Sequence, residues 1–128
     1  MGKRLQSQEV KPDLILSSPA KRALKTARII AEEIGYPKKK IVANAAIYGK
    51  GMSALLELIW SLDDSNNQVI LFGHNPDFTM LAEYLTDHRV GSMPTCGIFC
   101  VDFEIDSWRE ISEGKGLFVF FDYPQKQV

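Results

Sequence analysis

One stretch of the sequence, residues 69–78, constrains the fold more than any other. It reads Val-Ile-Leu-Phe-Gly-His-Asn-Pro-Asp-Phe, and four apolar residues between polar residues and a glycine are typical of a short buried strand. Asn75 and Pro76 then have the chemistry of a helix cap and a first helical residue. His74 is therefore predicted to lie at the carboxyl end of a strand, the edge where ligands bind in open α/β sheets.

A second strand and helix repeat this order earlier in the chain. Residues 14–16 form an apolar run too short for a helix. Ser18 and Pro19 are predicted to be the N-cap and first residue of a helix that ends at Gly35. If both strands are parallel in one sheet, both junctions open at the same edge, where helix N-termini favour an anion.

Arg22 follows the first junction and adds a guanidinium group that can bind phosphate oxygens in pairs. A histidine in the same place can donate a hydrogen bond to a phosphoryl oxygen or act as acid, base or nucleophile. Each residue alone is more often structural, but together they favour a phosphate site. The candidate phosphate-binding residues are Ser18, Arg22, His74 and Asn75, and the candidate catalytic residues are Arg22 and His74.

The remaining elements are less regular. A densely apolar helix is predicted from Ser53 to Leu62, and the period of two from Thr95 to Ile105 predicts a half-buried strand. Residues 108–111 are interpreted as a possible hairpin partner, and 117–121 as a last strand. Alternating strands and helices followed by further strands predict an α/β fold with a mainly parallel sheet and antiparallel additions.

Composition gives broad limits. The chain has 128 residues, 45% of them hydrophobic and 24% charged, with a net charge of −1, which predicts one globular domain over residues 1–128 and no general affinity for nucleic acid or membranes. No signal peptide or spanning segment is evident, so a cytoplasmic location is expected. Cys96 and Cys100 would lie about 13 Å apart in a strand, too far to form a disulfide. We expect no metal and no cofactor.

Five short motifs occur in order along the chain: Ser18-Pro19, Arg22-Ala23, Thr26-Ala27, Gly73-His74-Asn75-Pro76 and Pro94-Thr95. Together they resemble the histidine phosphatase superfamily, whose fold is the phosphoglycerate mutase-like one. The small size of the chain and its short insertions are most similar to those of the SixA phosphohistidine phosphatases. The resemblance covers about residues 1–105.

The resemblance implies a three-layer fold, with helices on both faces of a mainly parallel sheet, and a phosphoryl-enzyme mechanism. In the family a histidine in an Arg-His-Gly motif accepts the phosphoryl group, while a second arginine and a second histidine hold its oxygens. By motif position, Arg22 matches that arginine and His74 that histidine. The implied partners are a phosphohistidine-containing protein as substrate and inorganic phosphate as product.

Two departures from the family pattern matter. No Arg-His-Gly occurs in the sequence, and His88, the other histidine, matches no motif. We therefore expect a domain that is N-terminally incomplete and lacks its first strand, most simply through a late start or truncation. Otherwise another segment, or a second subunit in a dimer, fills the gap in the sheet. No carboxylate stands at 47–51, where many members carry a proton donor, which favours phosphohistidine as substrate.

Two main functions follow. The first is a phosphohistidine phosphatase, inactive in these 128 residues because the nucleophile is absent. The second is a non-catalytic domain that binds phosphate or a phosphoprotein through Arg22 and His74. A flavodoxin-like binding domain of unrelated origin is a weaker third.

Overall fold

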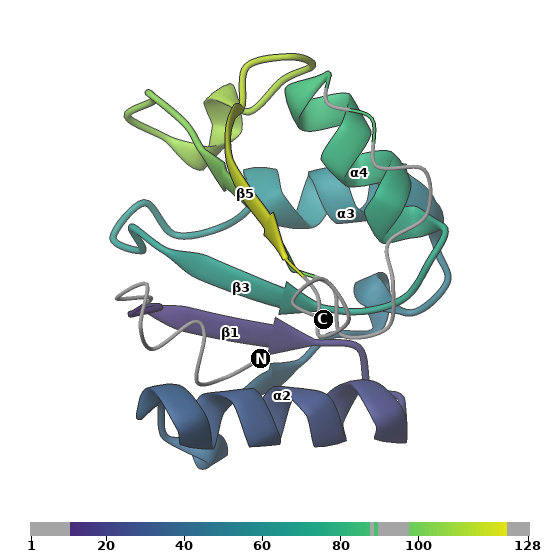
Figure 1. Ribbon diagram of the computed structural model, residues 1–128, viewed down its shortest axis with the longest axis vertical. Helices are drawn as coiled ribbons and strands as arrows, with labels where there is room; N and C mark the ends of the chain where they lie inside the picture. The colour runs from purple at the N-terminus through teal and green to yellow at the C-terminus, as the bar shows by residue number, and fades with distance from the viewer. Residues whose placement is uncertain (1–10, 88, 90–97, 123–128) are drawn as a thin grey trace. The chain divides into compact units, whose positions relative to one another are not determined.

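A computed structural model describes residues 11–87, 89 and 98–122 of the chain (Figure 1). The chain divides into two compact units, which we describe separately. The first comprises Met1–Gly49 and Ser65–His74, and the second Lys50–Asp64 and Asn75–Val128. The single-domain organisation stays a prediction. The start of the chain, His88, Pro94-Thr95 and Cys96 lie outside the described residues.

The first unit is built on a three-stranded parallel sheet. Its strands are β1 (Leu14–Ser17), β2 (Val42–Ala43) and β3 (Val69–Phe72), in the order β2-β1-β3. Pairing of β1 with β3 is in register from Leu14 opposite Val69 to Ser17 opposite Phe72. Both predicted strands are thus confirmed, and their carboxyl ends lie at the same edge of one parallel sheet.

Helix α2 (Lys21–Ile34) lies along this sheet (Figure 1). Alanines dominate its buried face, which lets the helix backbone approach the strands closely. The helix ends as predicted at Gly35, whose φ of 81° is left-handed and favours glycine. One cluster of the core joins Ile15 of β1 to Ala27 and Ala31 of α2, and all three are fully buried.

The start of α2 differs from the prediction. Ser18 and Pro19 precede the helix, and Ala20 is its N-cap, without a side-chain capping bond. The reason is local: the Ser18 hydroxyl accepts a hydrogen bond from the Ala20 backbone N–H, and a serine that bonds two residues ahead holds the chain in a turn rather than in a helix. Two 3₁₀ turns complete this unit, η1 (Lys38–Lys40) and η2 (Ala45–Ile47).

The second unit combines two helices with an antiparallel strand pair. Helices α3 (Gly51–Trp60) and α4 (Asp77–Thr86) pack together, and β4 (Ile98–Asp102) pairs with β5 (Leu117–Asp122). The predicted last strand is confirmed, and β4 is the described part of the strand predicted from Thr95 to Ile105. The antiparallel pairing is confirmed, but within the described residues β4 and β5 form a two-stranded sheet of their own and do not extend the parallel sheet. The helix predicted from Ser53 to Leu62 is found at Gly51–Trp60, so it begins and ends two residues earlier than predicted. At its start the Asp77 carboxylate accepts a hydrogen bond from the Gly51 N–H, 3.0 Å away.

Two further predictions in this unit are wrong. Pro76 is the N-cap of α4 and not its first residue, because the Asn75 side chain is engaged further along, where it accepts a hydrogen bond from the Thr79 hydroxyl. Residues 108–111 do not form a hairpin strand. They contain the 3₁₀ turn η3 (Trp108–Glu110), which a capping box between Ser107 and Glu110 stabilises.

Gly116 marks a close approach of backbone segments in the second unit. Its N–H donates to the Leu85 carbonyl at 2.7 Å, and a Cβ built there would overlap the Val101 side chain and lie 2.8 Å from that carbonyl oxygen. We expect Gly116→Ala to lower the free energy of unfolding by about 1–3 kcal/mol, the usual cost of overpacking. Urea denaturation checks this, with Lys115→Ala at the exposed neighbour as the control. Equal stability of the two variants would contradict the crowding.

Candidate functional site

Three strand ends meet at one edge of the sheet in the first unit. The Ser18 N–H, just after β1, donates to the Phe72 carbonyl at the end of β3, and the Asn44 N–H, just after β2, donates to the Ser17 carbonyl; both distances are 2.8 Å. These bonds continue the sheet pairing one residue past the strands. The loops that leave β1 and β3 are thereby held side by side.

Ser18 and His74 are brought together at this edge. His74 Nε2 lies 2.8 Å from Ser18 Oγ, and the same oxygen accepts the Ala20 N–H at 3.1 Å. Ser18 is fully buried, so its hydroxyl faces the imidazole and the start of α2. The structure therefore places Ser18 as a residue that positions His74, and its direct contact with phosphate stays a prediction.

The imidazole of His74 is held on a second side by an aromatic ring. Tyr48, just after η2, packs on it with ring centroids 5.3 Å apart and planes tilted by 57°. His74 is half-buried. Nδ1 makes no hydrogen bond within the described residues. In the tautomer in which Nε2 accepts a hydrogen bond from the Ser18 hydroxyl, Nδ1 carries the ring proton and can donate a hydrogen bond to an anion.

Arg22 lies in the first turn of α2, two residues after Ala20. Its side chain is exposed and makes no hydrogen bond or ion pair within the part of the chain that the structure describes. No hydrogen bond joins Arg22 and His74 in the described residues, where His74 is bonded to Ser18. Since the first turn of α2 lacks a side-chain cap and an acidic residue, its backbone N–H groups and the guanidinium are available to an anion.

Asn75, the remaining predicted residue, begins the second unit. It is exposed, and its Oδ1 accepts a hydrogen bond from the Thr79 hydroxyl, with 2.8 Å between the two oxygens. The structure thus assigns it a contact within the start of α4. Its role as a phosphate ligand stays a prediction.

Carboxylates of the first unit lie away from this edge, among the residues described. Asp13 precedes β1 and accepts hydrogen bonds from the N–H groups of Asn67 and Gln68, at the amino ends of the strands. Glu32 and Glu33 lie in the last turns of α2. No group of three His, Cys, Asp or Glu side chains in the described residues is arranged to hold a metal ion. The strand edge in this unit therefore offers donors and no carboxylate.

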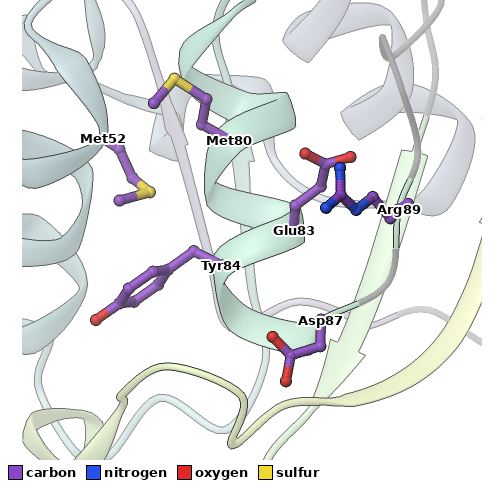
Figure 2. Close-up of a pocket in the computed structure, with 6 residues that line it drawn as sticks. All are labelled: Met52, Met80, Glu83, Tyr84, Asp87 and Arg89. Carbon is purple, nitrogen blue, oxygen red and sulfur yellow. The ribbon is translucent and has the colours of Figure 1, made fainter.

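The second unit has an open pocket of about 470 Å³ between α3 and the end of α4 (Figure 2). Figure 2 shows the carboxylate of Glu83 and the guanidinium of Arg89 pointing toward each other. None of the predicted site residues lines it, and its two carboxylates disfavour an anionic ligand. The lining residues are Met52, Met80, Glu83, Tyr84, Asp87 and Arg89.

Sequence reasoning missed how the site is held together. It assigned Ser18 to the helix as a cap, and it gave Tyr48 no part in the site. The signal was present in the register, since Ser18 and His74 follow strands that end opposite each other. Two polar side chains one and two residues beyond paired parallel strands lie within contact distance of each other.

Comparisons with known proteins agree with this architecture. The model of the histidine phosphatase superfamily (branch 1) matches residues 1–44, which include Ser18 and Arg22. No curated protein matches the sequence. No described helix is long and apolar enough to cross a membrane.

Solved structures share the fold. One is the protein histidine phosphatase SixA complexed with tungstate, with a TM-score of 0.70 at 20% identity, covering 94% of this chain and 74% of that one. Another, from Nakamurella multipartitia, was described as a candidate phosphohistidine phosphatase SixA; its TM-score is 0.74 at 15% identity, over 97% of this chain and 77% of that one. The predicted resemblance and the α/β fold are confirmed.

Proposed function

We propose that this chain is a phosphohistidine phosphatase domain of the SixA type, whose strand edge binds the phosphoryl group of a phosphohistidine-containing protein. One observation carries the proposal. The 2.8 Å contact between Ser18 Oγ and His74 Nε2 fixes an imidazole beside the uncapped N-terminus of the helix that carries Arg22. The superfamily match over residues 1–44 and the SixA fold support it.

The chemistry of these groups suits a phosphoryl group. Backbone N–H groups at the start of α2 and the guanidinium of Arg22 would bind two or more of its oxygens. His74, oriented by Ser18, would donate from Nδ1 to another. Preorganised donors of this kind stabilise the charge that develops on a phosphoryl group during transfer, which is the main electrostatic task in such reactions.

The leaving group points to phosphohistidine. The described part of the first unit offers no carboxylate at the strand edge to act as general acid. A phosphorylated imidazole leaves readily once solvent protonates it, whereas a sugar hydroxyl needs an acid. The site therefore fits a phosphorylated histidine better than a sugar phosphate.

These residues supply the binding half of the reaction. The Arg-His-Gly nucleophile motif does not occur among the 128 residues, so we propose that they hold a phosphoryl group without turning it over. The second candidate, a phosphate- or phosphoprotein-binding domain without catalysis, rests on the same observation. It differs only in whether a nucleophile is supplied from elsewhere.

Two measurements on the 128-residue chain test the proposal. Tungstate or inorganic phosphate, titrated by calorimetry, should bind with one site, and His74→Ala should weaken the binding. Incubation with a phosphohistidine peptide should release no phosphate above the spontaneous rate. Absent anion binding would remove the proposed site, and steady or burst release of phosphate would refute the claim that these residues lack turnover.

A further inference from the structure

The exposed face of α2 is basic. Lys21, Lys25 and Arg28 follow one another at intervals of four and three residues, so they lie on one side of the helix over about 10 Å. Arg22 lies next to the first of them. All four side chains are exposed, and none makes a hydrogen bond or ion pair within the described residues.

This placement opposes the stability of the helix itself. Two cations stand in the first turn, where the helix dipole favours anions, and no acidic residue accompanies them. Like charges three and four residues apart on a helix also repel one another. Glu32, the acid closest in spacing, is in a salt bridge with Lys38 at 3.4 Å. A helix that only needed to be solvated would gain from mixed charges, as the far end of α2 has.

The charge is concentrated in one part of the molecule. The first unit contains ten Lys and Arg against four Asp and Glu, whereas the second contains five against twelve. A net charge of −1 for the whole chain therefore conceals a strongly basic unit, the one that contains Ser18, Arg22 and His74. Such a local field steers an anionic partner toward the unit that carries it.

We propose that the basic face of α2 docks an acidic segment of the phosphoprotein, beside the histidine whose phosphoryl group occupies the strand edge. This inference rests on the proposed function and specifies the partner chemistry: Asp and Glu side chains flanking the phosphorylated residue. Ile29, 52% exposed, lies among these cations and gives an apolar contact that a folded or helical protein segment can cover.

A protein partner fits better than a nucleic acid. The basic face spans about 10 Å along α2, which is enough for a few ion pairs with a short acidic segment. The sequence pI of about 6.1 is also far below that of domains that bind nucleic acid through a basic surface.

The test uses two peptides that carry a stable phosphohistidine analogue, one flanked by Glu and Asp and one by Gln and Asn. In low salt the acidic peptide should bind the 128-residue chain about tenfold more tightly, since each exposed ion pair adds little. The double variant Lys25→Gln with Arg28→Gln should abolish that preference. The matched control, Lys39→Gln with Lys40→Gln, changes the same charge outside α2 and should keep it.

Several outcomes would overturn the docking surface. If the control variant, Lys39→Gln with Lys40→Gln, lost the preference for the acidic peptide to the same extent, the net charge of the chain and not the face of α2 would determine that preference. Equal affinity of the two peptides for the unaltered chain would remove the acidic partner, and tighter binding of a single-stranded oligonucleotide would favour nucleic acid. If analytical ultracentrifugation showed that the chain self-associates and that Lys25→Gln with Arg28→Gln reduces this association, the partner of α2 would be the acidic unit of a second copy of the chain.

The same experiment separates this inference from the proposed function. The unphosphorylated acidic peptide tests α2 alone, and tungstate tests the strand edge alone. If tungstate fails to bind but the acidic peptide still depends on Lys25 and Arg28, the proposed function is wrong and the docking surface remains. If tungstate binds equally to all variants and the peptides do not differ, the docking surface is wrong and the proposed function remains.

Discussion

Arg22→Ala is expected to weaken the binding of tungstate or phosphate by about 1.5–3 kcal/mol, the usual worth of a hydrogen bond to a charged group. This corresponds to a roughly 10- to 150-fold rise in Kd. The side chain is exposed and unpaired within the described residues, so its removal leaves no buried group unsatisfied. The change in Kd therefore reports the anion contact, and isothermal calorimetry measures it directly.

Arg28→Ala is the matched control for this change. It removes the same kind of side chain, also exposed, from the same helix, six residues further from Ser18. Because Arg28 would act on the anion only through long-range attraction, its removal is expected to weaken tungstate binding by less than about 0.5 kcal/mol. Arg22→Lys should fall between the two, because an ammonium keeps the charge but lacks the planar fork. If Arg22→Ala and Arg28→Ala bind tungstate equally well, Arg22 does not belong to the site.

The strand ends and the shared sheet edge were predictable from the sequence because each depends on a local pattern. A short apolar run that stops at a small or polar residue defines both β1 and β3, and Gly35 ends α2 through its own backbone freedom. Two strands separated by a helix favour parallel pairing. From these elements alone, Ser18 and His74 are placed at the same edge.

The helix starts and the contacts of the site were not predictable in the same way. Ser18, Asn75 and Ser53 are all good caps by residue type, but in the fold each cap position goes to another residue. Local side-chain bonds shift two of these starts, the Ala20 N–H to Ser18 and the Thr79 hydroxyl to Asn75. A partner distant in sequence acts at the third, where Asp77 accepts the Gly51 N–H. Residue preference is a weak local prior that such bonds override.

Ile15→Ala is expected to have the largest effect on stability, lowering the free energy of unfolding by about 2–5 kcal/mol. Ile15 is fully buried and packs against Ala27 and Ala31, which are also fully buried. The two fully buried residues around it are alanines, which are too short to fill the space that the substitution leaves, although larger half-buried side chains such as Ile34 and Ile70 also pack against this cluster. The cost should therefore include the lost burial and part of the cavity term, and urea denaturation gives it from the shift of the midpoint.

Ile29→Ala is the control, since it removes the same side chain from the same unit at a position 52% exposed. It should change the free energy of unfolding by less than about 0.5 kcal/mol. A loss as large as that of Ile15→Ala would mean that Ile29 is covered in solution, and a loss below about 1 kcal/mol for Ile15→Ala would contradict the packing of α2 on β1.

Anion binding by the two kinds of variant then separates the scaffold from the site. Ile15 pairs with Ile70 two residues before the ends of β1 and β3, so it supports the sheet that carries Ser18 and His74. In the folded fraction, Ile15→Ala should keep the Kd for tungstate while losing stability. Arg22→Ala should do the reverse, because an exposed arginine contributes little to folding. If Ile15→Ala and Arg22→Ala each changed both the Kd for tungstate and the free energy of unfolding, anion binding at the strand edge would depend only on the stability of the sheet.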